Sequence, residues 1–395
     1  MEFETSDCLN IVCISPAPWD YPIWTNRQHV MARMAKTHRV LYVFHPPFLR
    51  SSIKRTVFLN RYPFVSQSTH INENLTVFTS FVLPFGHRYA EIHRLNVRVG
   101  SRFLRSILRS LGFEKYLLWF YDPEAVHYLD YLSPVMACYD CVDEFTAMPS
   151  YEGAKRRMRL KRLELQLIER CDIVFATSRK IYEMKRQVNP NTFLVENVGD
   201  YEHFSKARLP SMQAPADFPK VQQPIIGFVG ALDHYKVDFA LIDYLATNRP
   251  RWSIVLIGAR LNKAEEHIPL PDRDNIFYLG LKEYSELPNY ISQFSACIIP
   301  YKMNEYVENV FPIKFFEFLA TGKPVITTAL PSLKKYSEVV RIAETYDDFV
   351  LGVEIAIADD SDDLREKRIS LARNNTWQSR VDKLLSHVDD ILRTR

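Results

Sequence analysis

The chain has 395 residues, of which 47% are apolar and 25% charged, and its formal net charge is +3. A chain of this length exceeds what one hydrophobic core supports, so we expect two domains of a globular enzyme. The polar residues 1–10 predict no secretory signal, and no apolar run approaches the roughly 20 residues that span a bilayer. The six scattered cysteines favour reduced thiols in a cytoplasm, with Cys138 and Cys141 as small buried residues rather than metal ligands.

The first half of the chain alternates strand-like with helix-like runs, which is typical of parallel α/β domains. Strands are predicted at residues 9–15, 38–44, 115–121, 135–141, 171–178 and 191–197, and helices at 24–37, 152–169 and 179–188. The stretch 206–224 is rich in Pro and polar residues and lacks periodicity, so it is the predicted linker.

After the linker the same pattern starts again. Strands are predicted at 224–230, 252–258, 275–280 and 296–301, and helices at 237–249, at 285–294 and from 363 to the end. We therefore predict a first domain at 1–205 and a second at 206–378, with a C-terminal helix at about 379–395 that packs back on the first. Two such domains place a ligand cleft between their facing loops.

The segment 308–328 (ENVFPIKFFEFLATGKPVITT) predicts a loop, a helix at 312–320, a Gly turn and a buried strand. Pro312 suits the first helical turn, where a missing N–H is tolerated. Lys314 and Glu317 are three residues apart and share a helix face. A cation near a helix start is unfavourable unless an anion is present, and the free N–H groups there attract phosphate. The segment therefore predicts a nucleotide diphosphate site, with an ordinary amphipathic unit as the alternative.

The second half presents four motifs in order: FVGALDHYK (228–236), WSIVLIGA (252–259), NIFYLG (275–280) and FPIKFFEFLATGKPVITT (311–328). This order resembles the donor domain of GT-B glycosyltransferases. The resemblance implies an α/β fold of two Rossmann-like domains that face a central cleft.

The first half carries further similar segments. ENVGDYEHF (196–204) is similar to the NGVDxxxF segment that precedes the interdomain linker of this superfamily. VMACYDCVDEFTAMP (135–149) and WDYPIWTNRQHVMARMA (19–35) resemble the bacterial exopolysaccharide branch. That branch is of the family 4 type and includes TuaH-like (teichuronic acid) and xanthan-type glucuronosyltransferase-like proteins.

The resemblance implies a nucleotide-sugar donor site in the second domain. Glu317 would bind the ribose hydroxyls, since a carboxylate accepts two hydroxyl protons, and Lys314 would neutralise the diphosphate or a sugar carboxylate. The loop GALDHYK keeps the spacing of a G-R-L-x-x-x-K element, with Ala231 in place of its Arg. N–H groups from Val310 to Ile313 would face the phosphates, and Leu281 to Tyr284 the uracil. The implied donor-binding residues are Gly230, Lys236, Leu281, Tyr284, Asn309, Val310, Phe311, Pro312, Lys314 and Glu317.

One position departs from the family pattern. Retaining members carry E-x7-E, and counting back eight residues from Glu317 gives Asn309, with Glu308 beside it. An inverting mechanism therefore stays open, in which a carboxylate or His of the first domain deprotonates the acceptor hydroxyl.

Asp143 is the leading candidate for that base. It follows a predicted strand in YDCVDEF, where loops reach the cleft, although it could instead cap the following helix. Asp140 and Glu144 are alternatives, and Asp122 with His127 form a second group.

The first loop and helix carry the residues that the resemblance places in the acceptor site. These are Trp19, Trp24, Arg27 and His29. An aromatic platform suits the face of a sugar, and a place in the core is the alternative for Trp24.

Positive charge gathers between residues 48 and 115, which hold eleven Lys or Arg and three acids. Five of these arginines recur at helical spacing among apolar residues: Arg94, Arg98, Arg102, Arg105 and Arg109. Such a basic amphipathic helix predicts contact with an anionic membrane surface, and the excess extends over Arg50 to Arg61 and recurs at 155–162. A core-packed helix with a solvated Arg face is the alternative. No recognised nucleic-acid module accompanies the charge.

Together these features predict a bacterial glycosyltransferase that moves a sugar from a UDP-sugar to a lipid-linked or polysaccharide acceptor. We expect it at the cytoplasmic face of the membrane, using no metal and no other cofactor, because Lys, Arg and helix dipoles stabilise the leaving diphosphate in this fold. Two alternatives stay open: a nucleotide-sugar 2-epimerase of the same fold, and a non-catalytic pseudo-glycosyltransferase scaffold.

Overall fold

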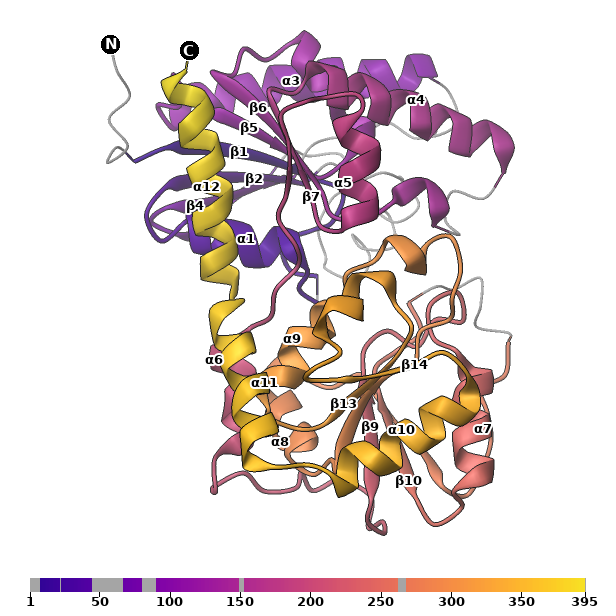
Figure 1. Ribbon diagram of the computed structural model, residues 1–395. Helices are drawn as coiled ribbons and strands as arrows, with labels where there is room; N and C mark the ends of the chain where they lie inside the picture. Colours follow the sequence, from indigo (N-terminus) through magenta and orange to yellow (C-terminus); the bar gives the residue numbers. More distant parts are fainter. Residues whose placement is uncertain are drawn as a thin grey trace. The chain divides into compact units, whose positions relative to one another are not determined.

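A computed structural model describes residues 8–21, 23–44, 67–79, 90–148, 153–261 and 268–394. The chain forms two compact α/β units (Figure 1). Unit 1 comprises Met1–Val195 and Val381–Arg395, and unit 2 comprises Glu196–Arg380. The change of unit at 195/196 precedes the predicted linker, so residues 196–205, which we assigned to the first domain, are part of unit 2.

The sheet of unit 1 has eight strands in the order β3-β4-β2-β1-β5-β6-β7-β8. Their bounds are β1 Asn10–Ser15, β2 Arg39–Phe44, β3 Gln67–Asn72, β4 Leu75–Thr79, β5 Leu117–Phe120, β6 Met136–Cys141, β7 Ile173–Ala176 and β8 Thr192–Leu194. Every neighbouring pair is parallel except the β3–β4 hairpin. The predicted strands of this half are confirmed, whereas the hairpin was not predicted.

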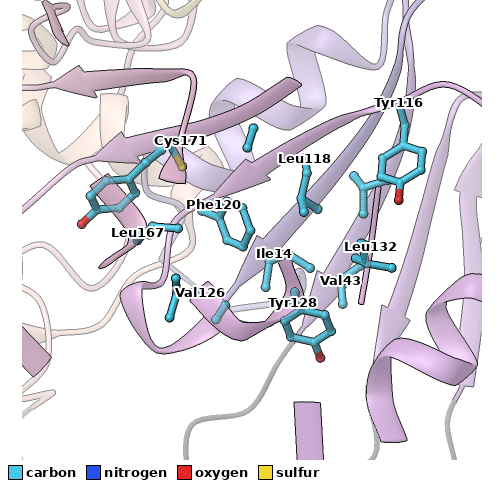
Figure 2. Close-up of a cluster of buried hydrophobic side chains, with 14 of the residues drawn as sticks. Ile14, Val43, Tyr116, Leu118, Phe120, Val126, Tyr128, Leu132, Leu167 and Cys171 are labelled. Atoms are coloured by element: carbon cyan, nitrogen blue, oxygen red, sulfur yellow. The ribbon is translucent and has the colours of Figure 1, made fainter. Parts of the chain in front are cut away.

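Helices cover both faces of this sheet. They are α1 Asn26–Met34, α3 Ala90–Ser110, the 3-10 helices η1 Pro123–Asp130 and η2 Phe145–Ala147, α4 Ala154–Arg170, α5 Arg179–Arg186, and α12 Trp377–Arg393 from Val381 onward. Ile14, Leu118 and Phe120 of the strands pack with Tyr128 of η1 and Leu167 of α4 in the core on one face (Figure 2).

The C-terminal helix α12 lies on the opposite face. Phe175 points away from Val174 and Ala176 of the Figure 2 core, because side chains alternate along a strand. The ring of His387 stacks on Phe193 with centroids 4.0 Å apart and also contacts Phe175. These contacts seat the end of the chain on unit 1.

The sheet of unit 2 is wholly parallel, with six strands in the order β11-β10-β9-β12-β13-β14. The strands are β9 Ile225–Val229, β10 Ser253–Ile257, β11 Ile276–Gly280, β12 Ala296–Ile299, β13 Val325–Thr328 and β14 Arg341–Ala343. The main helices are α6 Tyr201–Phe204, α7 Phe239–Asn248, α8 Leu287–Ser292, α9 Ile313–Ala320, α10 Tyr346–Ala358 and α11 Asp362–Asn374. Short 3-10 helices are η4 Ser205–Arg208, η6 Tyr284–Glu286, η7 Val307–Asn309 and η8 Pro331–Tyr336.

Two α/β units with parallel central sheets confirm the predicted fold class. The α10 helix was not predicted, although Thr345 and Asp348 form its capping box. None of the helices in the described ranges is long and apolar enough to cross a bilayer.

Candidate active site

In unit 2 the strand order reverses at β9, which has β10 on one side and β12 on the other. Open α/β sheets bind ligands outside the carboxyl ends of strands at such a switch point. Gly230 follows β9, and the chain from Pro300 to Pro312 follows β12 and leads into α9. The predicted donor residues on these segments therefore lie at the edge of the sheet where a ligand is expected.

Lys314 and Glu317 form an ion pair on α9. The Lys314 Nζ atom lies 2.6 Å from Glu317 Oε2, and the side chains are 19% and 2% exposed. Burial raises the pKa of Glu317, Lys314 opposes the rise, and Asp200 adds to it. The helix has Pro312 as its N-cap and no capping side chain, so its first turn leaves N–H groups for a ligand. A carboxylate, a cation and a helix start thus lie within one turn.

The loop before α9 corrects one prediction. Asn309 is buried, and its Nδ2 donates to the carbonyl of Glu305 at 2.6 Å. Among the residues that the structure describes, Asn309 Oδ1 has no hydrogen-bond partner. The N–H of Val310 donates to the carbonyl of Val307 at 3.0 Å, and Pro312 has no N–H. The Val310–Ile313 run therefore does not offer a complete row of phosphate donors.

Gly230 lies against the next strand end. Its N–H donates to the carbonyl of Ile257 at 2.9 Å. A Cβ on Gly258 would lie 1.8 Å from the Gly230 oxygen, and the φ of Gly258 is +145°. Only glycine fits at 258, a position that was not predicted although it lies within the WSIVLIGA motif.

Lys236 ends the loop that begins at Gly230. Its Nζ lies 5.1 Å from the centroid of the Tyr301 ring, which follows β12. Asn304 Nδ2 donates to the carbonyl of Tyr235 at 2.6 Å and ties the two loops together. Nothing in the local pattern pointed to Asn304, because its partner lies 69 residues away.

Tyr284 packs on the turn α6. The rings of His203 and Tyr284 stack with centroids 4.3 Å apart, and the hydroxyl of Tyr284 donates to Asp200 Oδ2 at 3.3 Å. His203 covers one face of the Tyr284 ring, so the nucleobase of a donor could stack only on the other face. Leu281 is exposed. Gly199 and Asp200 belong to the ENVGDYEHF segment (196–204). A Cβ on Gly199 would lie 2.8 Å from the Glu317 backbone nitrogen, so the segment passes close to α9 and brings Asp200 beside Glu317.

The four predicted acceptor residues differ in exposure. Trp19 is 9% exposed and packs on Tyr42, and His29 is 2% exposed. Trp24 is 37% exposed, and its ring contacts Trp19 and His29. Trp19 and His29 are thus buried, whereas Trp24, for which a core position was the alternative, and the half-buried Arg27 reach the surface.

Asp143 lies after β6, where it was predicted, and is half buried. Its neighbour Glu144 caps η2 by accepting from the Thr146 N–H. Lys185 Nζ lies 3.1 Å from Glu144 and 2.8 Å from Glu164, and all three are buried. The cap of the following turn is therefore Glu144 rather than Asp143, and Glu144 is committed to a structural ion pair.

No group of three or more His, Cys, Asp or Glu side chains within the described ranges is placed to hold a metal ion. Cys138 and Cys141 are buried thiols. Burial raises the pKa of Cys141.

Residues 223–374 match the family model described as "Glycosyl transferases group 1". A Bacillus subtilis (strain 168) protein described as a teichuronic acid biosynthesis glycosyltransferase, TuaH, is 29% identical over 293 residues, covering 69% of this chain and 72% of TuaH.

Solved structures share the fold. Sucrose-phosphate synthase from Thermosynechococcus elongatus has a TM-score of 0.71 at 15% identity, covering 98% of this chain and 100% of that chain. HepE from Anabaena, in complex with UDP-glucose, has a TM-score of 0.64 at 14% identity, covering 96% and 99%. The family match over residues 223–374, the similarity to TuaH and the two-unit fold agree with the resemblance seen in the sequence. The chain is a GT-B glycosyltransferase similar to TuaH.

Proposed function

We propose that this glycosyltransferase moves a sugar from a UDP-sugar to a lipid-linked or polysaccharide acceptor in bacterial cell-surface polysaccharide synthesis. The Lys314–Glu317 pair at the start of α9 carries the proposal, because it lies inside the matched region 223–374. The TuaH relative, described as acting in teichuronic acid biosynthesis, supports a role in cell-surface polysaccharide synthesis, and the HepE complexes with UDP and UDP-glucose support a UDP-sugar donor. They favour a transferase over the epimerase and scaffold alternatives.

In this proposal Glu317 accepts hydrogen bonds from the ribose hydroxyls. Lys314 and Lys236 face the diphosphate together with first-turn N–H groups of α9, and these charges stabilise the leaving UDP without a metal. Gly230, Leu281, Tyr284, Asn309 and Phe311 line the rest of the donor site. Lys314 is paired with Glu317 before the donor binds. In this proposal the Lys314 ammonium therefore turns from Glu317 toward the phosphate when the donor binds.

We also propose that α3 and α4 rest on the inner face of the cell membrane. Arg94, Arg98, Arg102, Arg105 and Arg109 are all exposed on α3, while Val97, Leu104 and Leu108 fill the core. Leu95 and Phe103 remain 45% and 47% exposed among the arginines, and Met158 of α4 is 71% exposed. Exposed apolar groups among cations suit an anionic lipid surface better than water. The basic stretch Arg50 to Arg61 lies outside the described residues.

A thermal-shift panel tests the donor class. We expect UDP-glucose, UDP-galactose, UDP-glucuronate or UDP-N-acetylglucosamine to raise the melting temperature, and GDP-sugars not to, because a ligand that binds only the native state stabilises it by mass action. Glu317→Ala should abolish the shift, whereas Glu286→Ala, an exposed glutamate on η6, should keep it. EDTA should leave the shift unchanged. Stabilisation by GDP-sugars alone, or an unchanged shift in Glu317→Ala, would contradict the proposal.

A further inference from the structure

The sheet of unit 1 also has a switch point. β1 has β2 on one side and β5 on the other, so the strand order reverses between β1 and β5. Asp122 comes two residues after the end of β5, at the carboxyl end of the sheet. Asp143 follows β6, one strand farther from the reversal. The position that the fold favours for a ligand in unit 1 is therefore beside Asp122.

One oxygen of Asp122 is committed to the backbone and the other is not. Oδ1 accepts from the N–H of Glu124 at 2.9 Å and caps η1. Oδ2 is buried, the residue is 3% exposed, and no donor reaches Oδ2 from any residue in the described part of the chain. Buried polar atoms of native proteins have partners in the great majority of cases, and an exception needs an explanation. A hydroxyl of a bound acceptor would supply the missing donor.

Titratable groups of six elements act on this carboxyl, on its neighbour Glu124 or on Cys13. Burial is the main cause that raises the pKa of Asp122 to about 7, and the Glu124 carboxylate adds to the rise while Arg27 opposes it. Arg156 and Arg159 act in turn on Glu124, and His93 Nε2 lies 2.7 Å from the Glu124 carbonyl oxygen. Arg27 and Asp140 both act on Cys13 of β1. The groups linked to the site, directly or through Glu124 and Arg27, are Arg27 of α1, Cys13 of β1, Glu124 of η1, Asp140 of β6, His93 of α3, and Arg156 and Arg159 of α4.

We propose that Asp122, rather than Asp143, is the base that takes the proton from the acceptor hydroxyl, with the acceptor sugar stacked on Trp24. The acceptor oxygen forms a bond to the anomeric carbon as its proton passes to Asp122 Oδ2. The bond from that carbon to the diphosphate breaks, and its electron pair leaves with the nucleoside diphosphate. Asp122 then releases its proton to water. The inference rests on the proposed UDP-sugar donor.

The test follows UDP release from the four UDP-sugars named above, with water and then octyl glucoside as acceptor, as a function of pH. Asp122→Asn should lower the rate by about 10²–10⁴-fold, the usual contribution of a general base, while the thermal shift with UDP stays unchanged. Asp130→Asn, at the exposed end of η1, is the matched control and should keep the wild-type rate.

Two neighbours give opposite signatures in the pH profile. The rate falls at low pH as the base becomes protonated. Arg27→Met removes a cation that lowers the pKa of Asp122, so this acidic limb should move to higher pH. Glu124→Gln removes an anion that raises it and keeps the backbone N–H, so the limb should move to lower pH. A structural role would not move the limb in either direction.

A full rate in Asp122→Asn, or limbs that stay in place in both neighbour variants, overturns the inference. A large loss confined to Asp143→Asn also overturns it and restores the first candidate. If Asp122→Asn does not fold, the two neighbour variants still decide. If no UDP-sugar is turned over, the donor proposal fails, and infrared titration of the wild-type protein then decides the inference. An Asp122 carboxyl that stays protonated from pH 5 to 9 would contradict it, because a base must be able to give up its proton to take another.

Discussion

Removing the charge of Lys314 tests how Glu317 is held. Lys314→Met keeps an aliphatic side chain and leaves the Glu317 carboxyl, 2% exposed, without the cation 2.6 Å away. Loss of one partner of a buried pair costs roughly 3–5 kcal/mol when the other stays charged. Because burial already raises the pKa of Glu317, loss of Lys314 raises it further, and the carboxyl avoids part of that cost by taking up a proton.

The destabilisation should therefore depend on pH. A group whose pKa is raised by folding contributes its stability below its unfolded pKa, and this is lost as the pH rises through the folded value. For Glu317 that window begins near the ordinary value of 4.5. We expect Lys314→Met to be close to wild type at pH 5 and about 3 kcal/mol less stable at pH 8, the lower end of the range for a broken buried pair.

Hydrogen exchange of peptides from β12 and α9, corrected for intrinsic rates, measures the free energy of unfolding of unit 2 at each pH. The slowest amides exchange only when the whole unit opens. The matched control is Lys335→Met, whose ion pair with Glu196 has exposures of 53% and 23%. A surface pair contributes at most about 1 kcal/mol, so this variant should show little change at either pH. A loss in Lys314→Met that is equal at pH 5 and pH 8 would refute the account of Glu317.

Two further predictions concern unit 1. Changing both Arg102 and Arg105 to Gln should lower flotation with phosphatidylglycerol vesicles by about 30-fold, since each cation near an anionic surface is worth about 1 kcal/mol. The same change at Arg341 and Arg365 of unit 2 should have no effect, and equal losses would argue against the α3 surface. Trp19→Ala should cost roughly 3–5 kcal/mol in thermal unfolding, because the ring is buried. Trp24→Ala should cost less and instead slow UDP release with octyl glucoside, and the reverse order would show that Trp24 is a core residue.

The sequence predicted the regular elements well where a local pattern encodes them. Buried parallel strands are continuous apolar runs, so 9–15 and 296–301 could be recognised as β1 and β12. The β3–β4 hairpin escaped because Gln67–Asn72 is polar and its strand is an exposed edge, which needs no apolar alternation. The domain boundary was placed too late because the segment from Glu196 packs on α9, a contact between distant parts of the chain.

The donor-side residues were found for the same local reason. Lys314 and Glu317 share a helix turn, so their spacing alone predicts that they meet. Asp200 and Asn304 reach the same region through folds of the chain that spacing does not record. Asp122 was one of several acidic candidates in the sequence. Only burial and the strand order distinguish it from Asp143.

The neutral side chain at 309 follows from the electrostatics of the loop. Asn309 is 3% exposed, so a glutamate there would bring a second buried carboxylate into the region that holds Glu317. A buried carboxylate needs a cation or several donors, and Lys314 is already paired with Glu317. An amide keeps the contact to the Glu305 carbonyl, which a carboxylate could not make, and offers its oxygen to a ligand. Converting this chain to the E-x7-E pattern by Asn309→Glu would therefore require a new cation as well as the new acid.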